Sequence, residues 1–414
     1  MCGLQLVRKD EKQMKKFEFY APTEIIFGQD TECRTGEMAK LYGANKVFVV
    51  YGGQSAKKSG LIDRVEKSIQ DAGLACMMSG GVVPNPLLST AERMKKEAID
   101  FGADFILAVG GGSVIDTAKA VAIGVANPEV DLWKFWTREV PLNKSLPFGT
   151  VLTIAAAGSE MSDTTVISND VDYDPPTKRG LGSRWNRGKF AIMNPELTMT
   201  LPIWQIGAGA ADIFMHTSER FFAPIQGNHL TDEIAAALFR NIITFGPRGV
   251  ENPKDYEAMS EIMWSGSISH NTITGLGAKG DTAREGDWAC HQLGMAISAI
   301  YDSTHGATLS AVWPAWCRYV RDADLHRFAY FAYMVYGIKK EDDMMASEMA
   351  IENTIAFFKK LGMPVTLTEL LGHRPTDEEI EALADECTYQ NTRTIGSMKE
   401  LERDAIIQIY KDAR

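Results

Sequence analysis

The chain has 414 residues, of which 45% are hydrophobic and 23% are charged. This composition is typical of a two-domain globular protein and excludes a disordered or fibrous chain. The longest uncharged stretches, such as residues 145–159, contain glycine, proline and serine and are too short to span a membrane. The 54 acidic and 43 basic residues give a net charge of −11, which disfavours nucleic acid and anionic lipid as partners.

The beginning of the chain and the cysteines bear on the cellular compartment. Residues 1–17 are rich in lysine but are not followed by an apolar segment of signal-peptide length, so we expect no export signal. The 6 cysteines lie far apart and form no CxxC pair. Because this spacing is typical of reduced thiols, we expect a cytoplasmic protein.

The first half of the chain alternates strand and helix patterns. Residues 46–51 and 105–109 are apolar and rich in β-branched or aromatic side chains, which predicts two strands. Between them, apolar residues four apart predict a helix over residues 61–73 that ends at Gly73. This alternation predicts a parallel sheet covered on both faces.

Three further expectations concern the same half. Ser89 and Glu92 have the spacing of a capping box, which predicts the start of a helix that continues to residue 101. Apolar runs at 150–154 and 190–193 continue the strand pattern, and the polar segment 168–189 is expected to be a long surface loop.

The second half of the chain is predicted to be helical. Apolar residues at 234, 238 and 242 predict a helix that ends at Gly246 and Pro247, and a second helix through residue 358 is closed by Gly362. Thr376 and Glu379 form a capping box ahead of another apolar periodic segment. Strand patterns are scarce after about residue 200.

A glycine run, residues 110–113, lies between a predicted strand and a predicted helix. Glycines let backbone N–H groups approach a phosphate, and the helix N-terminus favours an anion. The alternative is a tight turn without a ligand, and the run is not the GxGxxG fingerprint of dinucleotide-binding folds. Asp116 and Lys119, one helical turn apart, could form a surface ion pair.

Two pairs of side chains suggest a metal site. Asp212 and His216 are four residues apart, so both can lie on one helix face and form half of a divalent metal site. His291 and His305 could complete a shell of four ligands. An Asp-x-x-x-His spacing is common by chance, so the spacing alone leaves the metal open. The other histidines are expected to be surface or core residues: His229, His270, His326 and His373.

Together these features resemble one family. The chain resembles the iron-containing (group III) alcohol dehydrogenases, within them the branch of butanol dehydrogenases and broad aldehyde reductases. The resemblance runs from Phe17 to the C-terminus. It rests on the following segments in the family's order: residues 21–28, Pro84-Asn85-Pro86, residues 110–116, Gly158-Ser159-Glu160, and the pairs Asp212/His216 and His291/His305.

The resemblance implies a dehydroquinate synthase-like architecture, with an α/β dinucleotide-binding domain over residues 1–200 and an all-α metal-binding domain over 201–414. It implies that Fe²⁺ or Zn²⁺ is held by Asp212, His216, His291 and His305. It also implies a set of residues at the cofactor: Gly111, Gly112, Ser113, Asp116 and, less firmly carried over, Thr153, Lys189, Leu197 and Thr200. Relatives often pair through the N-terminal strand region, so we expect a homodimer.

Two positions depart from the family pattern. Ala157 stands where relatives often have threonine, which removes one hydroxyl contact to the cofactor. Met295 stands where several relatives have a further histidine, four residues after the third ligand, so a proton relay through that histidine is not carried over.

The end of the first predicted strand bears on the choice of dinucleotide. Family members that prefer NAD tend to carry aspartate where Gly52 stands, whereas a Gly-Gly-x-Ser run resembles the branch that uses NADP. The backbone N–H of Gly53, the Ser55 hydroxyl and the nearby lysines Lys57 and Lys58 can receive a 2′-phosphate. We therefore expect a preference for NADP(H), with a glycine turn that has no role in cofactor choice as the alternative.

The predicted activity is reversible hydride transfer between nicotinamide and small primary alcohols or aldehydes, such as butanol and butanal. Residues 288–293 and 299–301, near the predicted ligands, are apolar or aromatic with few cations, so an uncharged substrate is expected. Three alternatives stay open: a metal-dependent lyase or cyclase on the same fold, which needs a basic pocket; a metallohydrolase; and a non-catalytic interaction protein.

Overall fold

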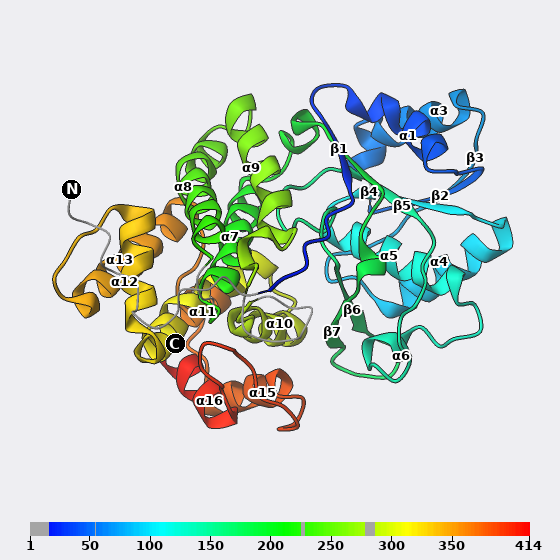
Figure 1. Ribbon diagram of the computed structural model, residues 1–414. Helices are drawn as coiled ribbons and strands as arrows, with labels where there is room; N and C mark the ends of the chain where they lie inside the picture. Colours follow the sequence, from blue (N-terminus) through cyan, green and yellow to red (C-terminus); the bar gives the residue numbers. More distant parts are fainter. Residues whose placement is uncertain (1–15, 54, 225–227, 278–285) are drawn as a thin grey trace.

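The computed structural model describes residues 16–53, 55–224, 228–277 and 286–414. The expectation of no export signal depends on residues 1–17, and most of these lie outside the described residues. Six parallel strands form one sheet in the order β1-β8-β5-β4-β2-β3 (Figure 1). Their bounds are β1 (Glu24–Phe27), β2 (Lys46–Tyr51), β3 (Ala75–Ser79), β4 (Phe105–Gly110), β5 (Phe148–Leu152) and β8 (Phe190–Met193).

Helices cover both faces of this sheet because its central strands are apolar on both sides. Val47 and Val49 belong to the core shared with α1 (Thr35–Leu41) and α3 (Leu61–Asp71). Phe48 and Val50 belong to the opposite core, with α4 (Leu88–Phe101) and α5 (Gly112–Ala126). The predicted parallel sheet with two covered faces is confirmed.

After β8 the described chain is predominantly helical and surrounds one central helix, α7 (Ile203–Phe221) (Figure 1). Every residue of α7 from Ile206 to Phe221 is buried. The larger helices around it are α8 (His229–Glu251), α9 (Tyr256–His270), α10 (Ala289–Tyr301), α11 (His305–Val320), α12 (Leu325–Tyr336), α13 (Asp343–Lys360), α15 (Asp377–Cys387) and α16 (Arg403–Asp412). None of the helices in the described ranges is long and apolar enough to cross a membrane.

The prediction of a long surface loop over residues 168–189 is wrong. Most of this segment belongs to an antiparallel hairpin, β6 (Thr164–Asn169) and β7 (Thr177–Gly182), which lies against α10 (Figure 1). Prolines and glycine obscured the strand pattern, and the hairpin turns at Pro175 and Pro176. Strands β1 and β3 were also not predicted, since β1 has only four residues and β3 carries no β-branched residue.

Two helix ends also differ from expectation. Ser89 does not cap α4, because its backbone N–H and its hydroxyl both donate to the Asp170 carboxylate, at 3.0 and 2.5 Å. Helix α8 does not end at Gly246 and Pro247 but continues to Glu251. Gly246 serves helix packing instead, since an added Cβ would lie 3.2 Å from side-chain atoms of both Ala210 and Leu361. By contrast, the capping box of Thr376 and Glu379 is present at α15.

Candidate active site

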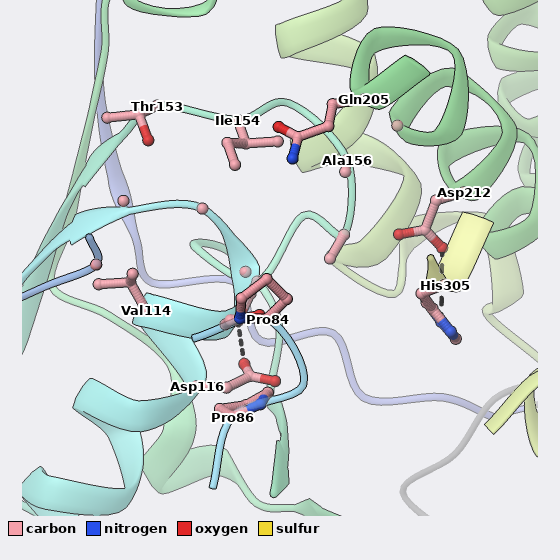
Figure 2. A pocket seen from close by; sticks show the side chains of 18 of the residues that line it. Pro84, Pro86, Val114, Asp116, Thr153, Ile154, Ala156, Gln205, Asp212 and His305 are labelled. Carbon is pink, nitrogen blue, oxygen red and sulfur yellow. Dashed lines mark hydrogen bonds and ion pairs between the residues drawn. The ribbon is translucent and has the colours of Figure 1, made fainter. Parts of the chain in front are cut away.

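A cavity of about 1040 Å³ lies between the sheet and the helices around α7. Its sheet side is formed by residues that follow β2, β4, β5 and β8, at the carboxyl edge where open α/β sheets bind ligands. Figure 2 shows Asp116 and Thr153 on this side, with Asp212 and His305 on the opposite side. The two sides approach closely because Gly209 of α7 packs on the loop after β5, where an added Cβ would be 2.3 Å from the carbonyl oxygen of Ala155.

The glycine run forms the junction between β4 and α5. A Cβ added at Gly110 would lie 2.5 Å from Val114, and one added at Gly111 would lie 2.8 Å from Ile154. Only glycine lets the chain turn this tightly, and the first N–H groups of α5 lack partners within the helix. The turn therefore presents a positive helix end to the cavity, which suits a phosphate.

Most of the residues predicted for the cofactor line this cavity. They are Gly52, Gly53, Ser55, Gly111, Gly112, Ser113, Asp116, Thr153, Leu197 and Thr200. Lys189 does not: it is exposed and directly precedes β8, where only its backbone takes part in the sheet. The lysine in the cavity wall is Lys178 of β7, which is buried and donates to Asn85 Oδ1 at 2.9 Å.

Asp116 and Lys119 do not form a surface ion pair. Lys119 is fully buried, and its Nζ donates to the carbonyl oxygens of Ser159, Ser162 and Thr164 and to the Ser159 hydroxyl, at 2.7–3.2 Å. The Ser159 hydroxyl in turn donates to Asp116 Oδ1 at 2.7 Å. Burial lowers the pKa of Lys119 to about 8, against the attraction of nearby carboxylates. This network fixes the loop after β5 and holds Asp116 at the cavity.

The four predicted metal ligands come together from three helices. Asp212 and His216 lie on α7, His291 on α10 and His305 at the start of α11. Asp212 Oδ1 is 3.5 Å from His216 Nδ1, 3.8 Å from His291 Nε2 and 3.9 Å from His305 Nε2. Potential ligand atoms of Asp212, His216 and His291 lie within 4.8 Å of one another. This convergence is the geometry that a single divalent ion requires.

The chemistry of these atoms also fits a metal ion. Asp212 Oδ1, His216 Nδ1 and His291 Nε2 are buried and have no hydrogen-bond partner among the residues that the structure describes, which is costly unless a ligand satisfies them. Burial lowers the pKa of His305 to about 3 and that of His216 well below its usual range, so both rings are neutral and able to bind a metal ion. His291 Nδ1 lies 2.9 Å from Glu219 Oε1; a carboxylate only accepts, so Nε2 is free for the metal.

Several residues of the cavity wall were missed by the sequence reasoning. Lys178, Arg220 and His270 all line the cavity, and Glu219 lies behind His291. Trp288, which the sequence already placed near the ligands, lines the cavity as well. Two corrections follow: His270 is part of the site, and the cavity wall holds cations despite the apolar neighbourhood of the ligands in sequence. Glu219 and Arg220 continue the α7 surface of Asp212 and His216 one turn further, a helical spacing that could have indicated them. Lys178 and His270 come from distant elements and left no such signal.

Both halves of the chain match models of one protein family. Residues 22–195 match the family described as iron-containing alcohol dehydrogenase, and residues 207–414 match the C-terminal region of the Fe-containing alcohol dehydrogenase family. The chain belongs to the iron-containing alcohol dehydrogenases. It is an enzyme, an oxidoreductase of this family, and the predicted membership is confirmed.

Individual relatives match along almost their whole length. The chain is 34% identical to NADH-dependent butanol dehydrogenase A of Clostridium acetobutylicum, over 96% of the chain and 99% of that protein. It is 30% identical to an NADPH-dependent aldehyde reductase of Escherichia coli, over 97% and 100%. The crystal structure of a butanol dehydrogenase from Thermotoga maritima superposes with a TM-score of 0.90 at 35% identity, over 97% of this chain and 99% of the other.

Proposed function

We propose that the chain is a metal-dependent, NADP(H)-linked alcohol dehydrogenase that reduces small aldehydes and oxidises the corresponding primary alcohols. The observation that carries this proposal is the convergence of Asp212, His216, His291 and His305 in the cavity that also contains the glycine turn. A metallohydrolase would need no such turn. The family match favours the dehydrogenase over a lyase or cyclase.

The mechanism assigns distinct tasks to the two sides of the cavity. Bound Fe²⁺ or Zn²⁺ would act as a Lewis acid on the substrate oxygen, and the nicotinamide would carry the hydride. The α5 N-terminus would hold the pyrophosphate. Asp212 and the three imidazoles would hold the ion, and Glu219 fixes the orientation of His291 through the 2.9 Å contact. The close packing of α7 on the loop after β5 would hold a bound cofactor and a bound substrate near each other.

The first test measures activity and metal together. We expect purified protein loaded with Fe²⁺ or Zn²⁺ to oxidise reduced dinucleotide with butanal, and chelation to abolish the reaction because the ligand atoms then lack their cation. The panel includes a carboxylate-bearing aldehyde and a sugar phosphate, because Lys178 and Arg220 line the cavity. A preference for either anionic compound over butanal by orders of magnitude would contradict the proposed uncharged substrate.

The preference for NADP(H) is supported by the loop after β2. Gly52, Gly53 and Ser55 line the cavity, and Lys57 and Lys58 follow in the short helix α2 (Ser55–Lys58). Lys57 Nζ lies 5.3 Å from the centre of the Tyr51 ring. The names of relatives do not select the dinucleotide, because both NADH- and NADPH-dependent enzymes occur among them.

Replacing Gly52 with aspartate tests this preference. An added Cβ at Gly52 meets only ordinary contacts, 3.5 Å from Val114 and 3.6 Å from the carbonyl oxygen of Val82, so the variant should fold. We expect the ratio of kcat/KM for NADPH to that for NADH to fall about 10- to 100-fold, since a carboxylate repels a 2′-phosphate.

The matched control for Gly52→Asp is Gly182→Asp, which adds the same charge on β7 where an added Cβ meets nothing within 4 Å. Metal content should be unchanged in both variants. A wild-type enzyme with higher kcat/KM for NADH than for NADPH would contradict the proposal.

The domain boundary at residue 200, the homodimer and the cytoplasmic location stay predictions.

A further inference from the structure

His270 is a buried histidine in the cavity wall that is not one of the four converging ligands. It is the last residue of α9 and only 7% exposed. Its ring stacks on that of His216, with 4.1 Å between the ring centres and 29° between the planes. Gly158, with φ +61°, packs directly against it, since an added Cβ would lie 2.8 Å from His270 Cβ. The ring is therefore held in place from both parts of the molecule.

A neighbouring arginine sets the tautomer of this ring. Arg220 Nη2 lies 2.8 Å from His270 Nδ1, and a guanidinium group can only donate, so Nδ1 accepts. Arg220 itself is fixed, because its Nη1 donates to the carbonyl oxygens of His216 and Ser269 and its guanidinium packs on the Trp288 ring. Because Nδ1 accepts this hydrogen bond, the ring carries its proton on Nε2.

This Nε2–H group has no hydrogen-bond partner within the described part of the chain, and the side chain lines the cavity. It is a donor available to a bound molecule. The donor lies beside the cluster of Asp212, His216, His291 and His305, because the His270 ring stacks on the ring of His216. Under the proposed function the reacting oxygen of the substrate binds at that cluster, which leaves the neighbouring donor at His270 for another atom of the substrate.

We propose that His270 Nε2–H is a specificity-determining donor that binds an oxygen on the carbon next to the carbonyl, so that the enzyme favours 2-hydroxyaldehydes over unsubstituted aldehydes of equal size. This inference rests on the proposed function. An alkyl chain at the same place leaves the donor without a hydrogen-bond partner. The transition state of an unsubstituted aldehyde is then bound more weakly, which lowers its kcat/KM. Met295, a thioether where several relatives are expected to carry histidine, cannot donate in its place.

The test compares glycolaldehyde with propanal, which differ by a hydroxyl in place of a methyl group. The measured quantity is the ratio of their kcat/KM values, with metal-loaded enzyme and reduced dinucleotide. We expect the wild-type ratio to favour glycolaldehyde, and His270→Phe, which keeps a ring against His216, to lower the ratio about 10- to 100-fold. His270→Leu is the second apolar variant, should the phenylalanine not fit.

His270→Gln retains an amide donor and should restore most of the ratio, which a purely structural role would not produce. Metal content and the KM for the dinucleotide should stay near wild type in all variants. His326→Phe, at a partly exposed histidine outside the cavity, is the matched control.

Three outcomes would overturn the inference. The first is an unchanged ratio in the folded, metal-loaded apolar variants. The second is a change confined to the KM for the dinucleotide, which would assign the donor to the cofactor. If metal-loaded wild type turned over neither glycolaldehyde, propanal nor butanal, the proposed function itself would fail, and this inference with it.

Discussion

Replacing His305 with alanine should strip the enzyme of its metal and lower kcat/KM by at least about 100-fold. The imidazole Nε2 lies 3.9 Å from Asp212 Oδ1, and its loss leaves one carboxylate and two imidazoles to hold the ion. Metal sites of this kind lose affinity steeply when a ligand or even its supporting hydrogen bond is removed. Metal content per chain and turnover are measured on the same preparation.

His326→Ala is the control for this prediction, because His326 is partly exposed and its Nδ1 lies 3.4 Å from Asp343 in an ion pair remote from the cavity. We expect it to retain metal and activity. Full metal occupancy together with an unchanged rate in His305→Ala would contradict the assignment of His305 as a ligand.

The second large effect is expected on stability. Lys119→Met should lower the free energy of unfolding by about 3–5 kcal/mol, because it leaves the buried carbonyl oxygens of Ser159, Ser162 and Thr164 without their donor. It also removes the cation nearest to the Asp116 network. In a protein of this size that loss corresponds to a fall in Tm of roughly 3–6 °C, measurable by scanning calorimetry at one fixed scan rate.

Lys96→Met is the matched control. Lys96 is 79% exposed and pairs with Asp100 at 2.8 Å on the surface of α4, where such pairs contribute about 0–1 kcal/mol. If both lysine variants lost the same small amount of stability, the buried network around Lys119 would not have the role assigned to it.

Sequence patterns predicted the elements whose signals are local. The strand over 46–51 and the helix beginning at residue 61 follow from apolar periodicity, and the Thr376 capping box follows from side chains three residues apart. Predictions failed where a distant residue changed the outcome. Ser89 binds Asp170 rather than its own helix, and Pro247 is tolerated within α8.

The site shows the same limit. Asp212 and His216 could be paired from helical spacing, whereas their convergence with His291 and His305 depends on how α7, α10 and α11 pack. Lys178 was assigned to a loop because the hairpin that carries it depends on pairing between strands β6 and β7. Contacts that depend on tertiary packing produce no periodic pattern in the sequence.

After its exposed first turn, helix α7 has no outward face. Because each of its residues from Ile206 to Phe221 is buried, substitutions cannot be absorbed on one side of it, as they can on a helix such as α13, where buried and exposed positions alternate. A map of tolerated amino acids along the chain would therefore show α7 as one continuous intolerant block rather than a stripe recurring every three or four residues. In the helical part of this enzyme, substitutions are therefore tolerated mainly at exposed positions of the helices that enclose α7.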